Sequence, residues 1–288
     1  MRKTANQRIE VRNSRMLYIN RSIVAGLFFL GSLAAFGQSG GIDSLNYKIY
    51  CTYQLSFLPD SISTSKKSEV FRLFASHGES IFMSANKFLQ DSIMRFPSRN
   101  FEQNQQKMEF LASHRTDFNF IIHKRGCDQV QTVDKIYHND FIYLEPAIPP
   151  KWKMSRDKKM IAGYQCQKAT TAFGGRTWEA WFTSEIPISD GPYKFCGLPG
   201  LIVQVADIQQ HFSFELTQLK NANETINYTT KGIKIEKEKY FQKLREYKQN
   251  PVGIAEQSGV VFTSGKNDII NRVAAKNKAE NNTLERFK

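Results

Sequence analysis

The sequence lacks the short motifs that mark common metal-binding and thiol-exchange sites. It has no H-E-x-x-H, no close H-x-H pair and no C-x-x-C, the spacings that zinc enzymes, zinc ribbons and thiol-exchange sites use. The five histidines are scattered along the chain, and we expect turn and strand-surface roles for them. The sequence therefore predicts no metal site, no cofactor and no catalytic residue.

The body of the chain also lacks an excess of charge, although the whole sequence carries a net charge of +13. Residues 1–37 hold six basic residues and one acidic residue, and residues 231–288 hold 13 basic and seven acidic residues. Residues 38–230 are left with a net charge of +2. Because no basic face is concentrated in the folded body, we expect no nucleic-acid partner.

Long apolar runs are missing apart from residues 22–37, which follow a basic stretch. As an α-helix these 16 residues would span about 24 Å, short of the roughly 30 Å hydrocarbon core of a membrane. A basic segment, a short apolar core and small residues at its end are typical of a secretory signal peptide. We therefore expect export to the periplasm or cell envelope, cleavage near Gly37, and membrane contact through this leader alone.

Cysteine is scarce, and the chain has four: Cys51, Cys127, Cys166 and Cys196. An even number in an exported protein favours disulfides, and four cysteines allow three connectivities. Cys166 lies in a predicted strand and Cys196 approaches a glycine-rich turn, so adjacent strands could bring them together. We predict a Cys166–Cys196 disulfide; the alternative is a pair that stays reduced and packs as small apolar side chains.

The chain does contain a succession of strands and turns from about residue 45 to 220. The clearest unit, residues 161–187, turns at Gly174-Gly175, a pair typical of a two-residue hairpin. In its second arm, alternation places Trp178 and Phe182 on one face and Trp181 on the other. Both faces therefore need some cover from a helix or a second layer. We take four rings as a candidate binding face for an apolar ligand: Tyr164, Trp178, Trp181 and Phe182.

Further strands, hairpins and helices follow from local patterns. A helix is predicted from Glu236 to Asn250, because its aromatic residues recur at helical spacing and Pro251 would end it. Its aromatic side should pack on the sheet, and the last dozen residues should fray. Other predicted strands are 47–55, 69–76, 80–84, 118–123 and 132–144, the last broken at 138–140, and short helices are predicted over 85–95 and 268–275.

These elements predict a mainly β (α+β) fold, with a large curved antiparallel sheet or half-barrel and a few packed helices, one of them C-terminal. The domain organisation that follows is a signal peptide at 1–37, a single β-rich domain at 38–250 and a basic, partly disordered tail at 251–288. A mature chain of this length suits one large domain.

The stretch Gly197-Leu198-Pro199-Gly200 stands directly before an apolar run. Proline followed by glycine meets the demands of a type II turn. A phosphate cradle would need several free N–H groups at a helix N-terminus, whereas here proline removes one donor and a strand follows. We therefore interpret these four residues as a turn that leads into a buried strand.

Residues 197–202, GLPGLI, resemble the name-giving motif of the GLPGLI family of exported proteins, found mainly in Bacteroidetes. The blocks GYQCQKA at 163–169, GRTWEAWFT at 175–183 and GPYKF at 191–195 resemble that family in the same order. The resemblance is strong over 161–207 and loose over 40–245. It implies an exported envelope protein, predominantly antiparallel β, with no assigned activity, ligand or catalytic residue.

The strand with Gly-Tyr-x-Cys, the glycine turn and the strand with Trp-x-x-Trp are also similar to curved sheets of the lipoprotein-carrier type, which hold apolar ligands against helices. We therefore expect a non-catalytic binding or accessory module for an apolar ligand or an envelope partner. The alternative is a periplasmic enzyme, a hydrolase or a thiol-redox accessory, with a site assembled from distant strands. A histidine within hydrogen-bond reach of a Cys, Ser or Asp in a cleft would favour the enzyme.

Overall fold

A computed structural model describes residues 41–146, 151–257, 259, 261 and 264–286. The predicted signal peptide at 1–37 lies outside the described residues. The described part forms one compact unit, and none of its helices is long and apolar enough to cross a membrane. Its elements are β1 (Ile42–Phe57), β2 (Lys67–Ser76), β3 (Glu79–Ser84), α1 (Ala85–Met94), α2 (Phe101–Ser113), β4 (Ile121–Arg125), β5 (Gln129–Ile136), β6 (Asn139–Pro146), β7 (Lys153–Ile161), β8 (Tyr164–Phe173), β9 (Arg176–Thr183), β10 (Leu201–Asp207), β11 (Phe212–Thr229), β12 (Ile233–Lys234), α3 (Lys237–Gln249), α4 (Pro251–Gln257) and α5 (Lys266–Ala279).

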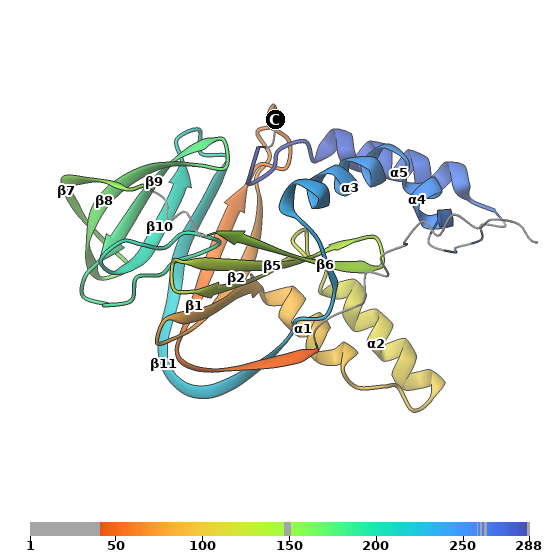
Figure 1. Cartoon of the computed structure of the whole chain (residues 1–288), viewed down its shortest axis with the longest axis horizontal. Coiled ribbons are helices and arrows are strands. Elements are labelled where there is room, and N and C mark those ends of the chain that lie inside the picture. Colours follow the sequence, from red (N-terminus) through yellow and green to blue (C-terminus); the bar gives the residue numbers. More distant parts are fainter. Residues whose placement is uncertain (1–40, 147–150, 258, 260, 262–263, 287–288) are drawn as a thin grey trace, which may run out of the picture. The chain divides into compact units, whose positions relative to one another are not determined.

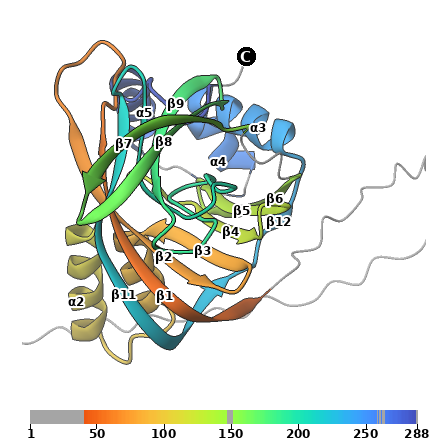
Figure 2. The same cartoon turned by 90° about the vertical axis from the view of Figure 1, so that its left-hand side faces the viewer.

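The strands form one open 12-stranded sheet, as the predicted fold class requires. Its order is β12-β6-β5-β4-β3-β2-β1-β11-β10-β9-β8-β7. All neighbours pair antiparallel except β12, which runs parallel to β6. The long strands β1 and β11 lie side by side at the centre and bend together (Figures 1 and 2). The sheet is therefore curved and antiparallel, and its two halves are joined by this central pair.

The bend in β1 coincides with a switch of buried face. The register with β11 shifts between Tyr47 and Ile49, where β11 holds one residue more than β1, and such a bulge locally disrupts the pairing of the two strands. Tyr47 and Tyr50 pack on one face of the sheet, while Cys51 and Tyr53 pack on the other. One strand thus contributes to two separate cores.

The helices lie on both faces of the sheet. Phe88 of α1 packs against the smaller core, beside Phe74, whereas Tyr240 of α3 packs on the opposite face, against Phe141 and Tyr143 of β6. In both views α3, α4 and α5 lie together, away from α1 and α2 (Figures 1 and 2). The face under α3 and α5 also carries the larger core.

Most local predictions are confirmed. The hairpin turns at Gly174-Gly175, both with positive φ, and α3 is capped at the predicted residues Glu236 and Asn250. Helix α2 was not predicted: its sequence is mostly polar, and none of its residues is buried. Its visible start signal is Asn100, whose side-chain oxygen accepts the Gln103 N–H at 2.8 Å.

The prediction that the last dozen residues fray is not met. α5 extends to Ala279, and the segment after it returns to the body of the protein, where Leu284 and Glu285 are buried. The backbone N–H of Arg286 donates to the carbonyl of Gly174 at 2.7 Å. A Cβ at Gly174 would lie 2.8 Å from Cγ of Glu285, so the glycine turn also leaves room for the returning segment.

The predicted Cys166–Cys196 disulfide is wrong. Cys196 is bonded to Cys127, in the β4–β5 turn, with 6.0 Å between the two Cα atoms. Cys166 and Cys51 are reduced and buried, so the reduced-pair alternative describes these two residues. The pairing follows the topology, because Cys166 points into the larger core, while the segment before Gly197 passes the β4–β5 turn.

We expect the oxidised protein, once denatured, to expose two alkylatable thiols, those of Cys51 and Cys166, and four after reduction. Because the bridge spans 69 residues, Cys127→Ser should lower the free energy of unfolding by about 4 kcal/mol on the chain-entropy estimate. Peptide mass spectrometry before and after reduction, and guanidinium unfolding of the variant, measure both. A peptide that links Cys166 to Cys196 would contradict the assignment.

Candidate functional site

The four rings of the candidate binding face belong to the packed part of the hairpin. Trp178 is fully buried, Phe182 is 2% exposed and Trp181 is 9% exposed, and Tyr164 packs at the margin of the larger core. The ring of Trp178 meets Phe195 edge-on at 4.8 Å. These rings line no part of the pocket described below, so the pocket lies elsewhere on the larger-core face.

Trp181 points to the other face of β9, where charged side chains cover it. The ammonium of Lys159 lies 4.2 Å from its ring centroid, and its indole N–H donates to Glu179 at 3.0 Å. Glu179 in turn pairs with Lys168 at 2.6 Å. The cover of the second tryptophan therefore includes lysine stems and a cation–π contact, and Trp181 is also a member of the larger core.

The signature turn at 197–200 leads directly into the buried strand β10, as predicted, but it is not a type II turn. The N–H of Gly200 donates to the carbonyl of Leu198 at 2.8 Å, the i to i+2 bond of a γ-turn. Gly200 has a φ of +148°, and a Cβ there would lie 2.0 Å from the carbonyl oxygen of Thr183. Glycine is thus required by the close approach of β9 as well as by the backbone conformation.

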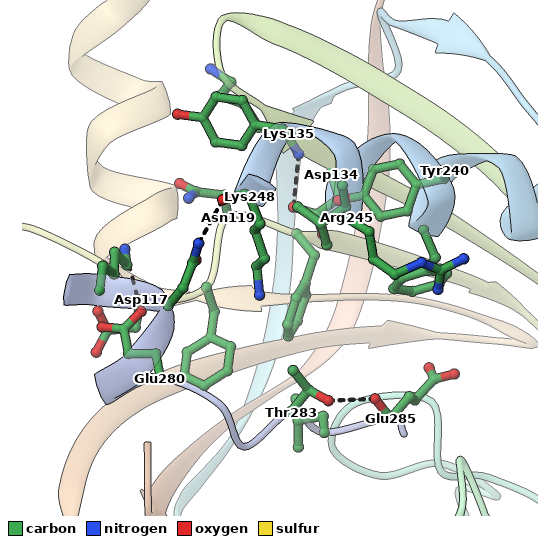
Figure 3. A pocket seen from close by; sticks show the side chains of 18 of the residues that line it. Asp117, Asn119, Asp134, Lys135, Tyr240, Arg245, Lys248, Glu280, Thr283 and Glu285 are labelled. Atoms are coloured by element: carbon green, nitrogen blue, oxygen red, sulfur yellow. Dashed lines mark hydrogen bonds and ion pairs between the residues drawn. The ribbon is translucent and has the colours of Figure 1, made fainter. Parts of the chain in front are cut away.

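A pocket of about 640 Å³ lies between the sheet, α3, α5 and the C-terminal segment (Figure 3). Strands β1, β5 and β6 and the segment before β4 supply one wall, and α3 supplies another through its aromatic side. Its apolar lining residues are Phe57, Pro59, Phe118, Phe120, Tyr137, Tyr143, Tyr193, Tyr240, Phe241, Leu244, Tyr247, Val273 and Leu284. Such a size and lining are typical of small-molecule sites.

Helix α3 leaves part of its apolar side uncovered in this pocket. Tyr240 is 1% exposed because it packs on β6. Leu244 and Tyr247, one and two turns further along, line the pocket and remain only half-buried. The amphipathic side that predicted this helix thus has two roles at once, because Tyr240, Leu244 and Tyr247 all pack in the core under α3 and also line the pocket.

A cluster of four charged side chains, two buried and two half-buried, lies beside the C-terminal segment, and one of them, Glu285, lines the pocket. Lys194 pairs with Glu145 and with Glu285, the latter at 2.6 Å. Lys237 pairs with the same two carboxylates, at 2.8 Å for Glu285. The hydroxyl of Tyr193 donates to Glu285 at 2.6 Å. Two lysines and two glutamates balance, so the cluster binds together β6, the segment before the signature turn, α3 and the chain's last described residues.

The charges of this cluster determine the protonation of Glu285. Burial alone would raise the pKa of this carboxyl, but Lys194 and Lys237 outweigh burial and lower its pKa to about 2. The pKa of Tyr193 is raised well above its ordinary value, mainly by burial and further by the negative charge of Glu285. Glu285 is therefore ionised and Tyr193 neutral at physiological pH.

A further carboxyl, Asp134 of β5, faces the pocket opposite α3 (Figure 3). It accepts hydrogen bonds from the Tyr240 hydroxyl and, at 2.7 Å, from the backbone N–H of Lys135. Burial is the main cause of its raised pKa. Among the described residues no ammonium group lies within ion-pair distance of it, and its hydrogen bonds come from the pocket wall itself.

The described residues show no group of three or more His, Cys, Asp or Glu side chains that could hold a metal ion. The buried histidine His123 contacts Glu79 at 2.8 Å and Tyr228 at 3.3 Å. Burial lowers its pKa, with Glu79 opposing the change. None of these three residues lines the pocket, so the convergence that would favour an enzyme is not found there.

Sequence reasoning missed Glu285, Lys194 and Lys237 as a unit. Lys194 lies in the block that resembles a known family, which was the one available signal for it. Glu285 lies in a polar stretch with no periodicity, and the side chains come together only because α5 returns the chain to the sheet. The aromatic residues of α3 were predicted to pack on the sheet, but not to border a pocket.

Gly200→Ala should lower the free energy of unfolding by well over 1 kcal/mol, because its Cβ would overlap the Thr183 carbonyl. Gly78→Ala is the matched control: Gly78 also has a positive φ, of +72°, but its Cβ would meet nothing within 4 Å. Urea unfolding of both variants separates the clash from the cost of the backbone conformation. Equal losses would contradict a special constraint at Gly200.

Acid should weaken the protein through Glu285. A carboxyl with a folded pKa of about 2, against an ordinary value of 4.5, contributes stability above pH 4.5 that is lost as the pH falls towards 2. The contribution is about 3 kcal/mol. Glu285→Gln should remove most of this pH dependence and destabilise the protein at pH 7 by about 3 kcal/mol, since it leaves two lysines with one buried carboxylate.

Urea unfolding between pH 2.5 and 7 measures both effects, with Glu215→Gln on the exposed side of β11 as the control. The same acid slope in wild type and Glu285→Gln would show that this carboxyl is not the titrating group.

Comparisons with known proteins add a family match and distant structural likenesses. Residues 173–204 match the family described as "Protein of unknown function (Porph_ging)", within the 161–207 block that carries the sequence resemblance. No curated protein matches the chain.

Among solved structures, two crystal forms of PNGF-II, in space groups P21 and C2, are 14% identical to this chain, with TM-scores of 0.48 and 0.49. The matches cover 70% and 72% of this chain but 34% and 33% of theirs, so this chain spans about a third of the length of PNGF-II. The LolA superfamily protein NE2245 from Nitrosomonas europaea is 6% identical, with a TM-score of 0.27, over 62% of this chain and 88% of its own. At TM-scores this low, the likenesses carry no argument about function.

Proposed function

We propose that this chain is an exported, non-catalytic binding module that holds an apolar ligand in the pocket between the sheet and helices α3 and α5. The observation that carries the proposal is the uncovered apolar side of α3. Leu244 and Tyr247 pack beside the core under α3, yet they stay half-buried and line a space of about 640 Å³. Removing such surface from water is favourable by roughly 25 cal/mol per Å², and a ligand in the pocket would do so.

The rest of the lining supports an apolar occupant. Phe118 contributes a half-buried ring from the segment before β4, and it meets Phe57 and Phe71 edge-on at 5.0 and 5.4 Å. These contacts hold the ring in place from the sheet side. The pocket wall is thus pre-formed on the sheet side, as is usual for small-molecule sites.

The polar groups at the base of the pocket favour binding over catalysis. Glu285 is ionised, and both its oxygens accept hydrogen bonds from lysines. Asp134 accepts from Tyr240 and the Lys135 N–H. The described lining contains no histidine, cysteine or serine that could act with them as a nucleophile–base pair. The contacts of Glu285 and Asp134 support a structural role, in which they hold the elements of the pocket wall together.

Export is the second part of the proposal. It is supported by the basic and apolar leader at residues 1–37 and by the Cys127–Cys196 disulfide, because disulfides persist in oxidising compartments. The GLPGLI resemblance points the same way. An apolar ligand carried through the periplasm or envelope would need the shielding that such a pocket gives.

Leu244→Gln should weaken binding of an apolar ligand about tenfold or more, because it places an amide on the wall that the ligand would cover. The measurement is fluorescence titration of delipidated protein with an environment-sensitive acyl probe. Met108→Gln is the matched control, since Met108 lies on α2, is 58% exposed and lines no part of the pocket.

The proposal fails if the wild-type protein does not bind the probe. It also fails if Leu244→Gln and Met108→Gln bind it equally well while both keep the wild-type melting temperature. A loss confined to Leu244→Gln supports the pocket as the site.

A further inference from the structure

The pocket is lined by equal numbers of acidic and basic side chains, but not all of them have a partner of opposite charge within the described chain. Four carboxyl groups and four cations line it: Asp117, Asp134, Glu280 and Glu285, and Lys135, Arg245, Lys248 and Lys276. Whether a ligand meets net charge there depends on which of these groups already have partners.

Three of the carboxylates are paired with lysines. Glu285 lies between two of them in the buried cluster. Asp117 pairs with Lys67 at 3.2 Å, and Glu280 pairs with Lys67 at 3.6 Å and with Lys276 at 3.5 Å. Asp134 is the one carboxyl group of these four that has no lysine partner among the described residues, and it accepts hydrogen bonds from the pocket wall.

Two of the cations are paired as well, Lys276 with Glu280 and Lys135 with Asp140 at 3.6 Å. Arg245 and Lys248 differ. Within the described residues, no carboxylate lies within ion-pair distance of either, and both line the pocket. They lie three residues apart on α3 and therefore on the same side of that helix, with Lys248 half-buried. Figure 3 shows both beside the aromatic wall.

The position of Lys248 in the last turn of α3 has a simpler explanation, because a cation there interacts favourably with the helix dipole. That effect needs neither Arg245 nor the pocket, and it would not change ligand affinity. Lys239 and Lys243 of the same helix are exposed and line no part of the pocket. They provide a matched pair of cations for comparison.

Resting on the proposed function, we propose that the pocket selects a single-chain amphipath with an acidic head group, which Arg245 and Lys248 bind while the chain lies against the aromatic wall beside Leu244. An acidic head group supplies the charge that these two cations lack. A charge-assisted hydrogen bond of this kind is about twice as strong as a neutral one. The shared chemistry is an anionic oxygen group, carboxylate or phosphate, on an apolar chain.

The test compares three ligands of equal chain length by calorimetry with delipidated full-length protein: dodecanoate, dodecyl phosphate and dodecanol. Wild type should bind at least one of the two anions about tenfold or more tightly than it binds the alcohol. The double variant Arg245→Gln/Lys248→Gln should lose this preference and keep its affinity for dodecanol. Lys239→Gln/Lys243→Gln should behave as wild type.

The two anions distinguish the source of the head group. Tighter binding of dodecanoate indicates a fatty-acid-like ligand, and tighter binding of dodecyl phosphate indicates a lipid phosphate. Equal affinity of wild type for all three ligands would overturn the head-group inference and leave the proposed apolar site intact. Loss of dodecanol binding in the Arg245/Lys248 variant would also overturn it, because the two residues would then act through pocket shape. Binding of none of the three would overturn the proposed function itself.

Discussion

The cluster of Lys194, Glu145, Lys237 and Glu285 is the constraint on which the arrangement of the pocket depends. Each lysine contacts both carboxylates, so no member can leave without an uncompensated buried charge, which is costly in a low-dielectric interior. The four residues come from strand β6, the segment before the signature turn, the first turn of α3 and the C-terminal segment. The contacts among these four residues hold the start of α3 against β6 and hold the C-terminal segment beside both. The pocket lies between these elements.

The signature turn acts on this cluster through geometry. Gly200 lets the backbone pass against Thr183, and Cys196 is bonded to the β4–β5 turn. Between the hairpin and this turn, Tyr193 and Lys194 are held with their side chains directed at Glu285. None of Gly197, Pro199 and Gly200 lines the pocket. The turn is therefore a positioning device, whose effect on the pocket is transmitted by the residues that precede it.

Local elements such as hairpins, strands and helices could be predicted from the sequence, whereas contacts between residues far apart in the chain could not. The Gly174-Gly175 hairpin, the strands up to β6 and α3 follow from alternation, turn residues and helical spacing, and all are present. The disulfide partner of Cys196 could not be deduced, because the choice between Cys127 and Cys166 depends on how the chain folds over the sequence separation of 69 from Cys127 to Cys196. For the same reason Glu285 was assigned to a fraying tail, since its partners are 48 to 92 positions away. The four candidate rings do not line the pocket for a different reason: alternation shows which face a ring points to, but not whether another side chain, such as Phe195 against Trp178, already packs against it.

Two kinds of charge thus meet around one apolar wall. The buried cluster is balanced, and each of its charges is directed at another member, so it gives rigidity and little attraction for a ligand. Arg245 and Lys248 are not balanced within the described chain, and they lie on the face of α3 that also carries Leu244 and Tyr247. On the proposed function, this arrangement would give the pocket a direction, with the apolar end of a ligand beside the aromatic rings and its acidic end at Arg245 and Lys248. An apolar surface alone would hold a ligand in either orientation, and the unequal neutralisation of the pocket's charges supplies the difference.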